Sequence, residues 1–117
     1  MKYNEMAKKL INDSIKNEEL IDCLNSNQIN VIGMAVLKII ERKYCDESIV
    51  GALKKIASLL SGWKAVGPYQ IGHLAAAALF LVRDQAALDC FSRIYDNLKE
   101  IDKYLIDNFI EQCEKTV

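Results

Sequence analysis

A single apolar stretch near the middle of the chain constrains the fold more than any other feature. From Leu74 to Val82 every residue is apolar, and the stretch ends at Arg83 and Asp84. It is well short of the roughly 20 residues needed to cross a bilayer. We therefore expect a helix from about Tyr69 to Arg83 that is apolar nearly all round and packed on several sides. The rest of the chain must supply its neighbours.

The flanking segments favour helices over strands. The chain has one proline and five glycines, and it contains no Asn-Gly or Asp-Gly hairpin signal. Apolar residues recur at steps of three and four. Asp84 is expected to cap the sixth helix, and Asp46 or Ser48 the fourth. We predict an all-α fold of about seven antiparallel helices. Positions expected to face inward include Tyr3, Ile11, Leu37 and Ile101.

Composition and cysteine spacing predict one soluble domain, residues 1–117. A half-apolar chain of this length, 51% hydrophobic, can bury a core without disulfides or metal. The cysteines form neither a CxxC pair nor a Cys/His cluster. We expect Cys23, Cys90 and Cys113 to be buried thiols of predicted helices and the protein to be in a reducing cytoplasm. The charged amino terminus lacks the apolar core of an export signal. The four cysteines are Cys23, Cys45, Cys90 and Cys113.

An internal repeat suggests stacked helix pairs. Residues 28–37 align with residues 70–79 at an offset of 42, with Gln, Ile, Ala and Leu coinciding. Downstream, residues 49–60 match residues 87–98 at an offset of 38. The pattern resembles HEAT or armadillo-like repeats, whose helix pairs recur every ~40–47 residues. The resemblance implies a short HEAT-like α-solenoid with units at about 28–60 and 70–98; a generic helical bundle is the alternative.

No catalytic, cofactor or metal site is predicted. His73 is the only histidine, and it lies in the first turns of the apolar helix, where a structural hydrogen bond is the commoner role than partner contact or catalysis. Gly-rich phosphate loops and HExxH, GxSxG or DxDxDG motifs do not occur. A pair of catalytic carboxylates is not selected by any spacing. The sequence therefore favours a protein that is not an enzyme.

A loop between the fourth and fifth helices carries two aromatic residues, Trp63 and Tyr69, at its ends. Trp and Tyr are enriched among interface hot spots, so both residues are candidates for partner binding. The alternative is that Trp63 packs over the ends of the two helices.

The charge is unevenly divided along the chain. Residues 1–83 hold eleven basic and eight acidic residues, and residues 84–117 hold four basic and eight acidic, so +3 and −4 make up the net charge of −1. The net charge of −1 argues against general binding of nucleic acid or anionic membranes, which relies on clustered Lys and Arg. The acids are either an ordinary solvated surface or a docking surface for a basic protein. The acidic candidates are Asp89 and Asp96 on the sixth helix and Glu100, Asp107 and Glu111 on the seventh.

These features predict a non-catalytic protein-binding module of unknown oligomeric state. A small HEAT-like chain with an acidic face and the segment GPYQIGHLAAAAL resembles bacterial immunity proteins of toxin–immunity pairs, including those of contact-dependent growth inhibition. The resemblance implies an inhibitor that covers the functional surface of a cognate toxin, with a basic toxin domain as partner.

Two alternatives to the inhibitor stay open. The first is a HEAT-like enzyme acting on nucleic acid, such as an alkylpurine DNA glycosylase. It would use Trp63 beside a flipped base and a basic patch in the amino-terminal half. The second is a structural adaptor whose apolar stripe docks another helix. The patch would comprise Lys38, Arg42, Lys43, Lys54, Lys55 and Lys64.

Overall fold

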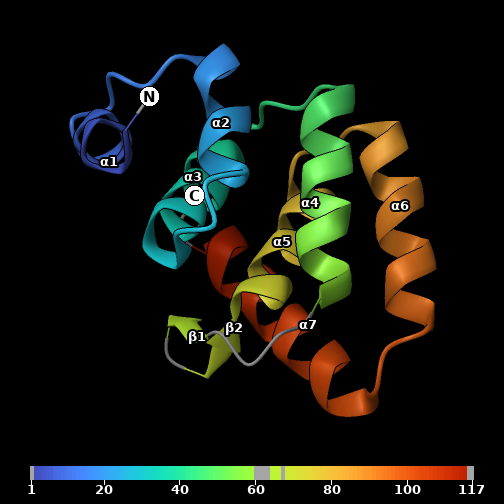
Figure 1. Cartoon of the computed structure of the whole chain (residues 1–117). Helices are drawn as coiled ribbons and strands as arrows, with labels where there is room; N and C mark the ends of the chain where they lie inside the picture. The colour runs from blue at the N-terminus through green and yellow to red at the C-terminus, as the bar shows by residue number, and fades with distance from the viewer. Residues whose placement is uncertain (1, 60–63, 67, 116–117) are drawn as a thin grey trace.

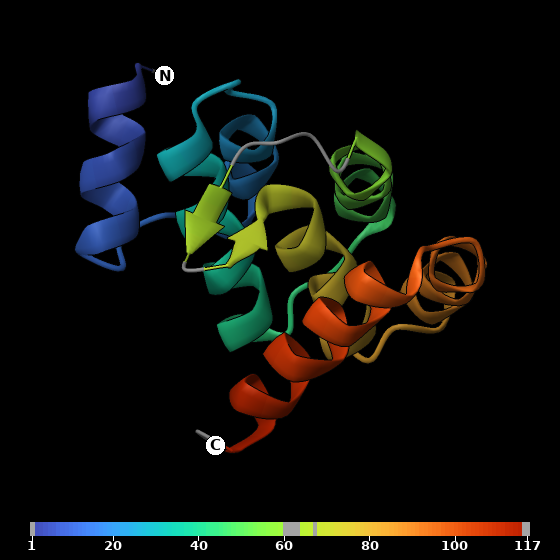
Figure 2. The same cartoon turned by 90° about the horizontal axis from the view of Figure 1, so that it is seen from below.

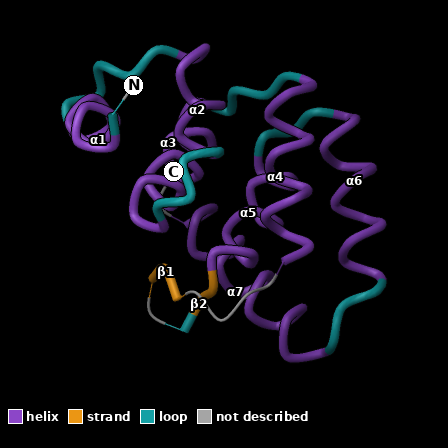
Figure 3. Tube along the Cα trace, in the orientation of Figure 1, coloured by secondary structure: helices purple, strands orange, loops and turns teal. Residues whose placement is uncertain are grey.

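The computed structural model describes residues 2–59, 64–66 and 68–115 of the chain. Helices dominate these residues, which confirms the predicted all-α class (Figures 1 and 3). The elements are α1 (Tyr3–Ile11), a 3₁₀ turn η1 (Asn17–Glu19), α2 (Leu20–Leu24), α3 (Ile29–Arg42), α4 (Glu47–Leu59), β1 (Lys64–Val66), β2 (Tyr69–Gln70), α5 (Ile71–Leu81), α6 (Gln85–Asp96) and α7 (Glu100–Lys115).

Helix α5 is the centre of the core, as its composition predicts. Ten of its eleven residues are buried, and it packs on α3, α4, α6 and α7. Its run of alanines, Ala75–Ala78, is at most 1% exposed. Small side chains let the neighbouring helices approach closely while dispersion contacts remain dense. In Figures 1 and 2 α5 lies in the interior of the molecule.

The helices contact one another in two series. Helices α2, α4 and α6 pack in that order, and helices α3, α5 and α7 do the same. The series are joined where α2 packs on α3, α4 on α5 and α5 on α6. Figure 1 shows α4 and α6 side by side, with α5 and α7 behind them.

Equivalent positions of the sequence repeat begin equivalent helices. Helices α3 and α5 start at Ile29 and Ile71, which are 42 residues apart. Helices α4 and α6 start 38 residues apart, and each is preceded by an aspartate. Asp46 Oδ1 accepts the Ile49 N–H at 2.9 Å, and Asp84 Oδ2 accepts the Ala87 N–H at 3.1 Å. Both aspartates therefore act as N-caps.

The loop before α5 contains a hairpin that the sequence did not predict. Strand β1 pairs antiparallel with β2, with an irregular register in which Lys64 opposes Gln70 and Val66 opposes Tyr69. Strands of three and two residues are too short to show an alternating pattern. The hairpin contacts α3 and leads directly into α5.

Four apolar side chains expected to face inward are exposed instead. Ile101 lies five residues before the buried Ile106, which turns it to the opposite side of α7. Ile11 follows the buried Met6 by the same step. The exposed fractions are 50% for Tyr3, 72% for Ile11, 41% for Leu37 and 60% for Ile101.

Helix α1 is peripheral, and α3 is the helix on which it chiefly packs. Its buried side chains are Met6 and Leu10. Ion pairs join α1 and the loop after it to later segments. Lys9 Nζ lies 2.6 Å from Glu19 of η1, and Asp13 lies 2.9 Å from both Lys38 and Arg42 of α3. In Figure 1 α1 stands at the edge of the molecule.

Among the described residues, every helix is too short or too polar to cross a membrane.

Two helical glycines offer a test of the packing. A Cβ atom on Gly51 would meet nothing within 4 Å, and one on Gly33 would lie 3.8 Å from Ile71 Cδ1, an ordinary contact. Because glycine inside a helix costs about 0.5–1 kcal/mol relative to alanine, Gly51→Ala and Gly33→Ala should each raise the free energy of urea unfolding by about that amount. The reverse change, Ala86→Gly at an exposed position of α6, is the control and should lower the free energy of unfolding. A loss of stability in Gly33→Ala alone would contradict the spacing of α3 and α5.

The Asp46 cap makes a pH-dependent contribution to stability. Hydrogen bonds from the Ile49 N–H and the Tyr44 hydroxyl hold the pKa of Asp46 below its usual 3.8. A lowered folded-state pKa stabilises the protein above pH 3.8 and loses that effect as the pH falls through the folded value. Asp46→Ala should cost about 1 kcal/mol at pH 7, and the difference from wild type should shrink below pH 4. Ser48→Ala should stay within about 0.5 kcal/mol of wild type at both pH values.

Candidate functional site

Three of the predicted acidic residues lie together on α7. Steps of seven and four residues place Glu100, Asp107 and Glu111 on one face of the helix, and all three are exposed. Helix α7 carries five acidic and two basic residues between positions 100 and 115. The negative charge predicted for the carboxyl-terminal part of the chain is therefore concentrated on one helix.

Each of these carboxylates has a polar neighbour within the protein. Asp107 Oδ2 accepts the Tyr95 hydroxyl at 2.8 Å, which joins α7 to α6. This hydrogen bond raises the pKa of Tyr95. Glu100 lies 3.7 Å from Lys103, and Glu111 lies 3.1 Å from Lys115. Exposed ion pairs of this kind contribute little to stability, so these side chains can exchange partners at low cost.

The sequence did not identify two apolar side chains beside these acids. Tyr104 is 64% exposed and Ile101 is 60% exposed. A helical wheel places Tyr104 next to Glu111, on the side away from Asp107, and places Ile101 about 60° further round the helix. Their signal was present in the spacing, but the apolar character of Ile101 led to its assignment to the core. We define the α7 outer face as Glu100, Ile101, Tyr104, Asp107 and Glu111.

The two predicted acids on α6 lie on the exposed side of that helix. Asp89 and Asp96 are exposed and lie seven residues apart. Asp89 Oδ1 accepts a hydrogen bond from Gln85 Nε2 at 2.9 Å. Tyr95 of α6 reaches α7 through its hydrogen bond to Asp107, and its ring stacks on that of Phe91 at 5.3 Å. Asp96 ends α6 four residues before Glu100 begins α7, whereas Asp89 lies about two turns further back along α6.

Of the two aromatic residues predicted to contact a partner, Trp63 and Tyr69, the structure describes only Tyr69. Tyr69 is 4% exposed. Its ring meets Phe109 edge-on at 5.2 Å, and its hydroxyl accepts a hydrogen bond from Asn108 Nδ2 at 3.0 Å. Tyr69 therefore fastens the hairpin to α7 and is not part of the α7 outer face. Trp63 lies outside the described residues.

His73 forms a buried link between α5 and α7. The imidazole is 1% exposed. Nδ1 accepts a hydrogen bond from the Gln70 N–H at 2.9 Å. Nε2 therefore carries the ring hydrogen and donates a hydrogen bond to Asp102 Oδ1 at 2.9 Å. Both ring nitrogens are engaged, as expected for a structural histidine.

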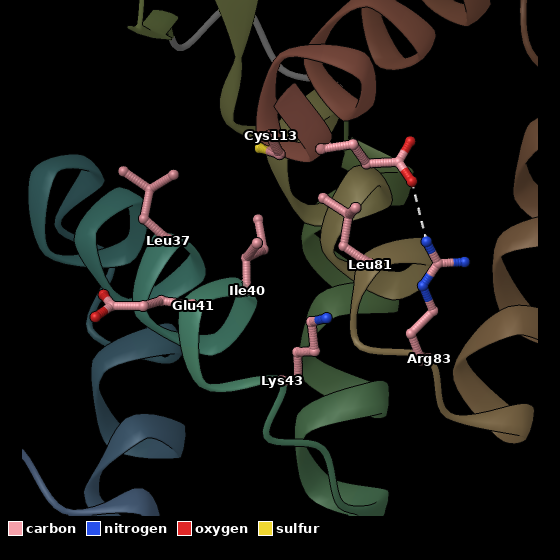
Figure 4. Close-up of a pocket in the computed structure, with 8 residues that line it drawn as sticks. Leu37, Ile40, Glu41, Lys43, Leu81, Arg83 and Cys113 are labelled. Carbon is pink, nitrogen blue, oxygen red and sulfur yellow. Dashed lines mark hydrogen bonds and ion pairs between the residues drawn. The ribbon is translucent and has the colours of Figure 1, made fainter. Parts of the chain in front are cut away.

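A hollow of about 690 Å³ opens where the carboxyl-terminal ends of α3, α5 and α7 converge (Figure 4). Its apolar wall comprises Leu37, Ile40, Leu81 and Cys113. Its rim carries charges of both signs, from Glu41, Lys43, Arg83 and Glu114. Burial raises the pKa of the Cys113 thiol. The hollow lies outside the α7 outer face, which is formed by other residues.

Two members of the predicted basic patch are engaged within the protein. Lys38 contacts Asp13 at 2.9 Å and Glu41 at 3.2 Å. Arg42 donates to Asp13 and to Asn17, each at 2.9 Å. These acids offset the positive charge at this place, which lowers its attraction for phosphates.

Among the described residues, no cluster of three or more His, Cys, Asp or Glu side chains has the geometry to hold a metal ion. Comparison of the chain with protein-family models, with curated proteins and with solved structures gave no match.

The His73 link can be tested by its removal. His73→Leu leaves the Gln70 N–H and the Asp102 carboxylate without the imidazole between them, and an unsatisfied buried polar group costs about 1–3 kcal/mol. We expect a loss of that size in the free energy of urea unfolding. Arg83→Gln, which removes an exposed ion pair with Glu114 at 3.0 Å, should cost less than about 1 kcal/mol. Equal losses in the two variants would contradict a structural role specific to His73.

Proposed function

We propose that this protein is a non-catalytic binding module whose α7 outer face docks on a basic surface of another protein. The observation that carries the proposal is the exposure of Tyr104 and Ile101 among the acids of one helix. An exposed tyrosine and isoleucine can be desolvated by a partner, and the acids around them select partners of positive charge.

The two kinds of residue would have separate roles in binding. Long-range attraction from Glu100, Asp107 and Glu111 would increase the association rate and make it dependent on salt. Tyr104 would supply contact area at low conformational cost, because its side chain has few rotatable bonds. Loss of the acids should therefore slow association, whereas loss of Tyr104 should speed dissociation.

We propose a short HEAT-like solenoid as the scaffold for this surface. The helix starts, which follow the sequence offsets of 42 and 38 residues, and the similar caps Asp46 and Asp84 support a duplicated unit. The two series of contacting helices support stacking. The sequence neighbours that pack extensively are α2 on α3, α4 on α5 and α5 on α6; the last is the helix pair of the unit at 70–98, whereas α3 and α4, the pair of the unit at 28–60, are not in extensive contact. A stacked scaffold presents a rigid extended surface to a partner.

An inhibitor of a bacterial toxin, acting in the cytoplasm, is the form of this function that we favour. An acidic face suits a toxin domain that binds an anionic substrate, because the same basic surface would attract both. Covering that surface would block the toxin without any chemistry by the inhibitor. The resemblance of the sequence to immunity proteins supports this form of the proposal.

Capture from the native cell with matched baits tests the docking face. We expect the wild-type protein to capture a basic protein that Glu100→Lys/Glu111→Lys fails to capture, because the variant repels a positive surface. Asp107 is left intact since it bonds to Tyr95. The control bait, Glu5→Lys/Asp22→Lys, changes the charge equally at exposed sites on α1 and α2. Captured proteins are compared by quantitative mass spectrometry.

Binding kinetics with the purified partner then separate the two roles. Glu100→Lys/Glu111→Lys should slow association about tenfold or more at low salt, and Tyr104→Ala should weaken affinity by about 2 kcal/mol through faster dissociation. Association that is equally fast for the wild-type, charge-reversed and control proteins would rule out docking by α7.

A further inference from the structure

We propose that the hollow between α3, α5 and α7 binds a medium-chain carboxylate, with the alkyl chain against the apolar wall and the carboxylate at Lys43. This is a small-molecule site, independent of protein binding by the α7 outer face. The proposal stands on the volume of the hollow, its apolar wall and the distribution of charge around its rim.

The wall of the hollow presents apolar surface that the protein's own side chains leave uncovered. Leu37 is 41% exposed although it stands in the middle of a helix of the core. Ile40, one turn further along the same helix, and Leu81, the last residue of α5, also line the hollow. In Figure 4 the side chains of Leu37, Ile40 and Leu81 border one open space. A volume of about 690 Å³ is within the usual range of ligand sites, about 300–1,000 Å³.

The rim charges are paired with one exception. Arg83 Nη2 lies 3.0 Å from Glu114, and Glu41 Oε2 lies 3.2 Å from Lys38. Lys43 has neither an ion pair nor a side-chain hydrogen bond to any described residue. In Figure 4 its ammonium group points toward the gap between Ile40 and Leu81. The rim charge that has no partner among the described residues is therefore positive, which favours an anion over a cation or a neutral molecule.

The backbone holds Lys43 at this position. Lys43 ends α3 in the left-handed conformation, with φ 52° and ψ 36°, and its N–H bonds to the carbonyls of Ile39 and Ile40. Lys43 therefore lies about one helical turn after Ile40, at a position fixed by the end of α3. A carboxylate at its ammonium group places the following methylenes beside Ile40 and Leu81.

Isothermal titration with octanoate, decanoate and decanol tests the proposal. Each added methylene that enters the hollow should tighten binding about fourfold, so decanoate should bind about 15-fold more tightly than octanoate. Lys43→Gln should weaken decanoate binding by roughly twofold to fivefold and leave decanol unchanged. The matched control Lys54→Gln, on the exposed side of α4, should bind decanoate as the wild type does.

A second variant tests the wall without relying on charge. Leu37→Asn puts a polar group in the apolar wall at a partly exposed position, and it should weaken decanoate and decanol about fivefold or more. Ile11→Asn, at an exposed position of α1, is its control. Decanoate should also slow maleimide labelling of Cys113, which lines the hollow, relative to Cys45. Failure of decanoate to bind at millimolar concentration, or binding that neither Lys43→Gln nor Leu37→Asn weakens, would overturn the proposal.

Discussion

The fold depends on covering one helix that has no polar side. Helix α5 can be stable in water only with neighbours on all sides, and α3, α4, α6 and α7 provide them. Four alanines in succession allow these helices to approach closely. The polar groups at the start of α5 are satisfied within the protein, because His73 accepts from Gln70 and donates to Asp102. One buried histidine thus connects the hairpin, the central helix and α7.

The position of α5 decides which surfaces are left for binding. Each surrounding helix turns its apolar stripe toward α5, so its other side faces outward. On α7 the buried residues Ile106, Phe109 and Ile110 direct Tyr104 and the acids away from the core. Where the carboxyl-terminal ends of α3, α5 and α7 meet, apolar surface is left open as the hollow. The outer face and the hollow are consequences of the same packing.

Most of the fold could be predicted from the sequence, and the site only in part. The helices follow from apolar periodicity, and the cap of α6 follows from Asp84, because these signals are local. The hairpin and the exposure of Leu37 depend on how segments distant in the sequence pack together, which no local pattern records. The exposure of Ile101 follows from its spacing to the buried Ile106. The acids of α7 share a face as their spacing predicts. That Tyr69 is buried against Phe109, and that Tyr104 is exposed instead, depends on the rotation of α7 about its axis.

The peripheral position of α1 has a consequence for the motions of the native protein. Its burial rests on Met6 and Leu10 and on ion pairs at its end and in the following loop, whereas α5 is enclosed by four helices. Opening α1 exposes little apolar area and leaves the packing around α5 intact. Its amide hydrogens therefore exchange through a local fluctuation of low free energy, and those of α5 exchange only when the whole domain unfolds. The chain has two levels of cooperativity, with a separable amino-terminal helix on an all-or-none core.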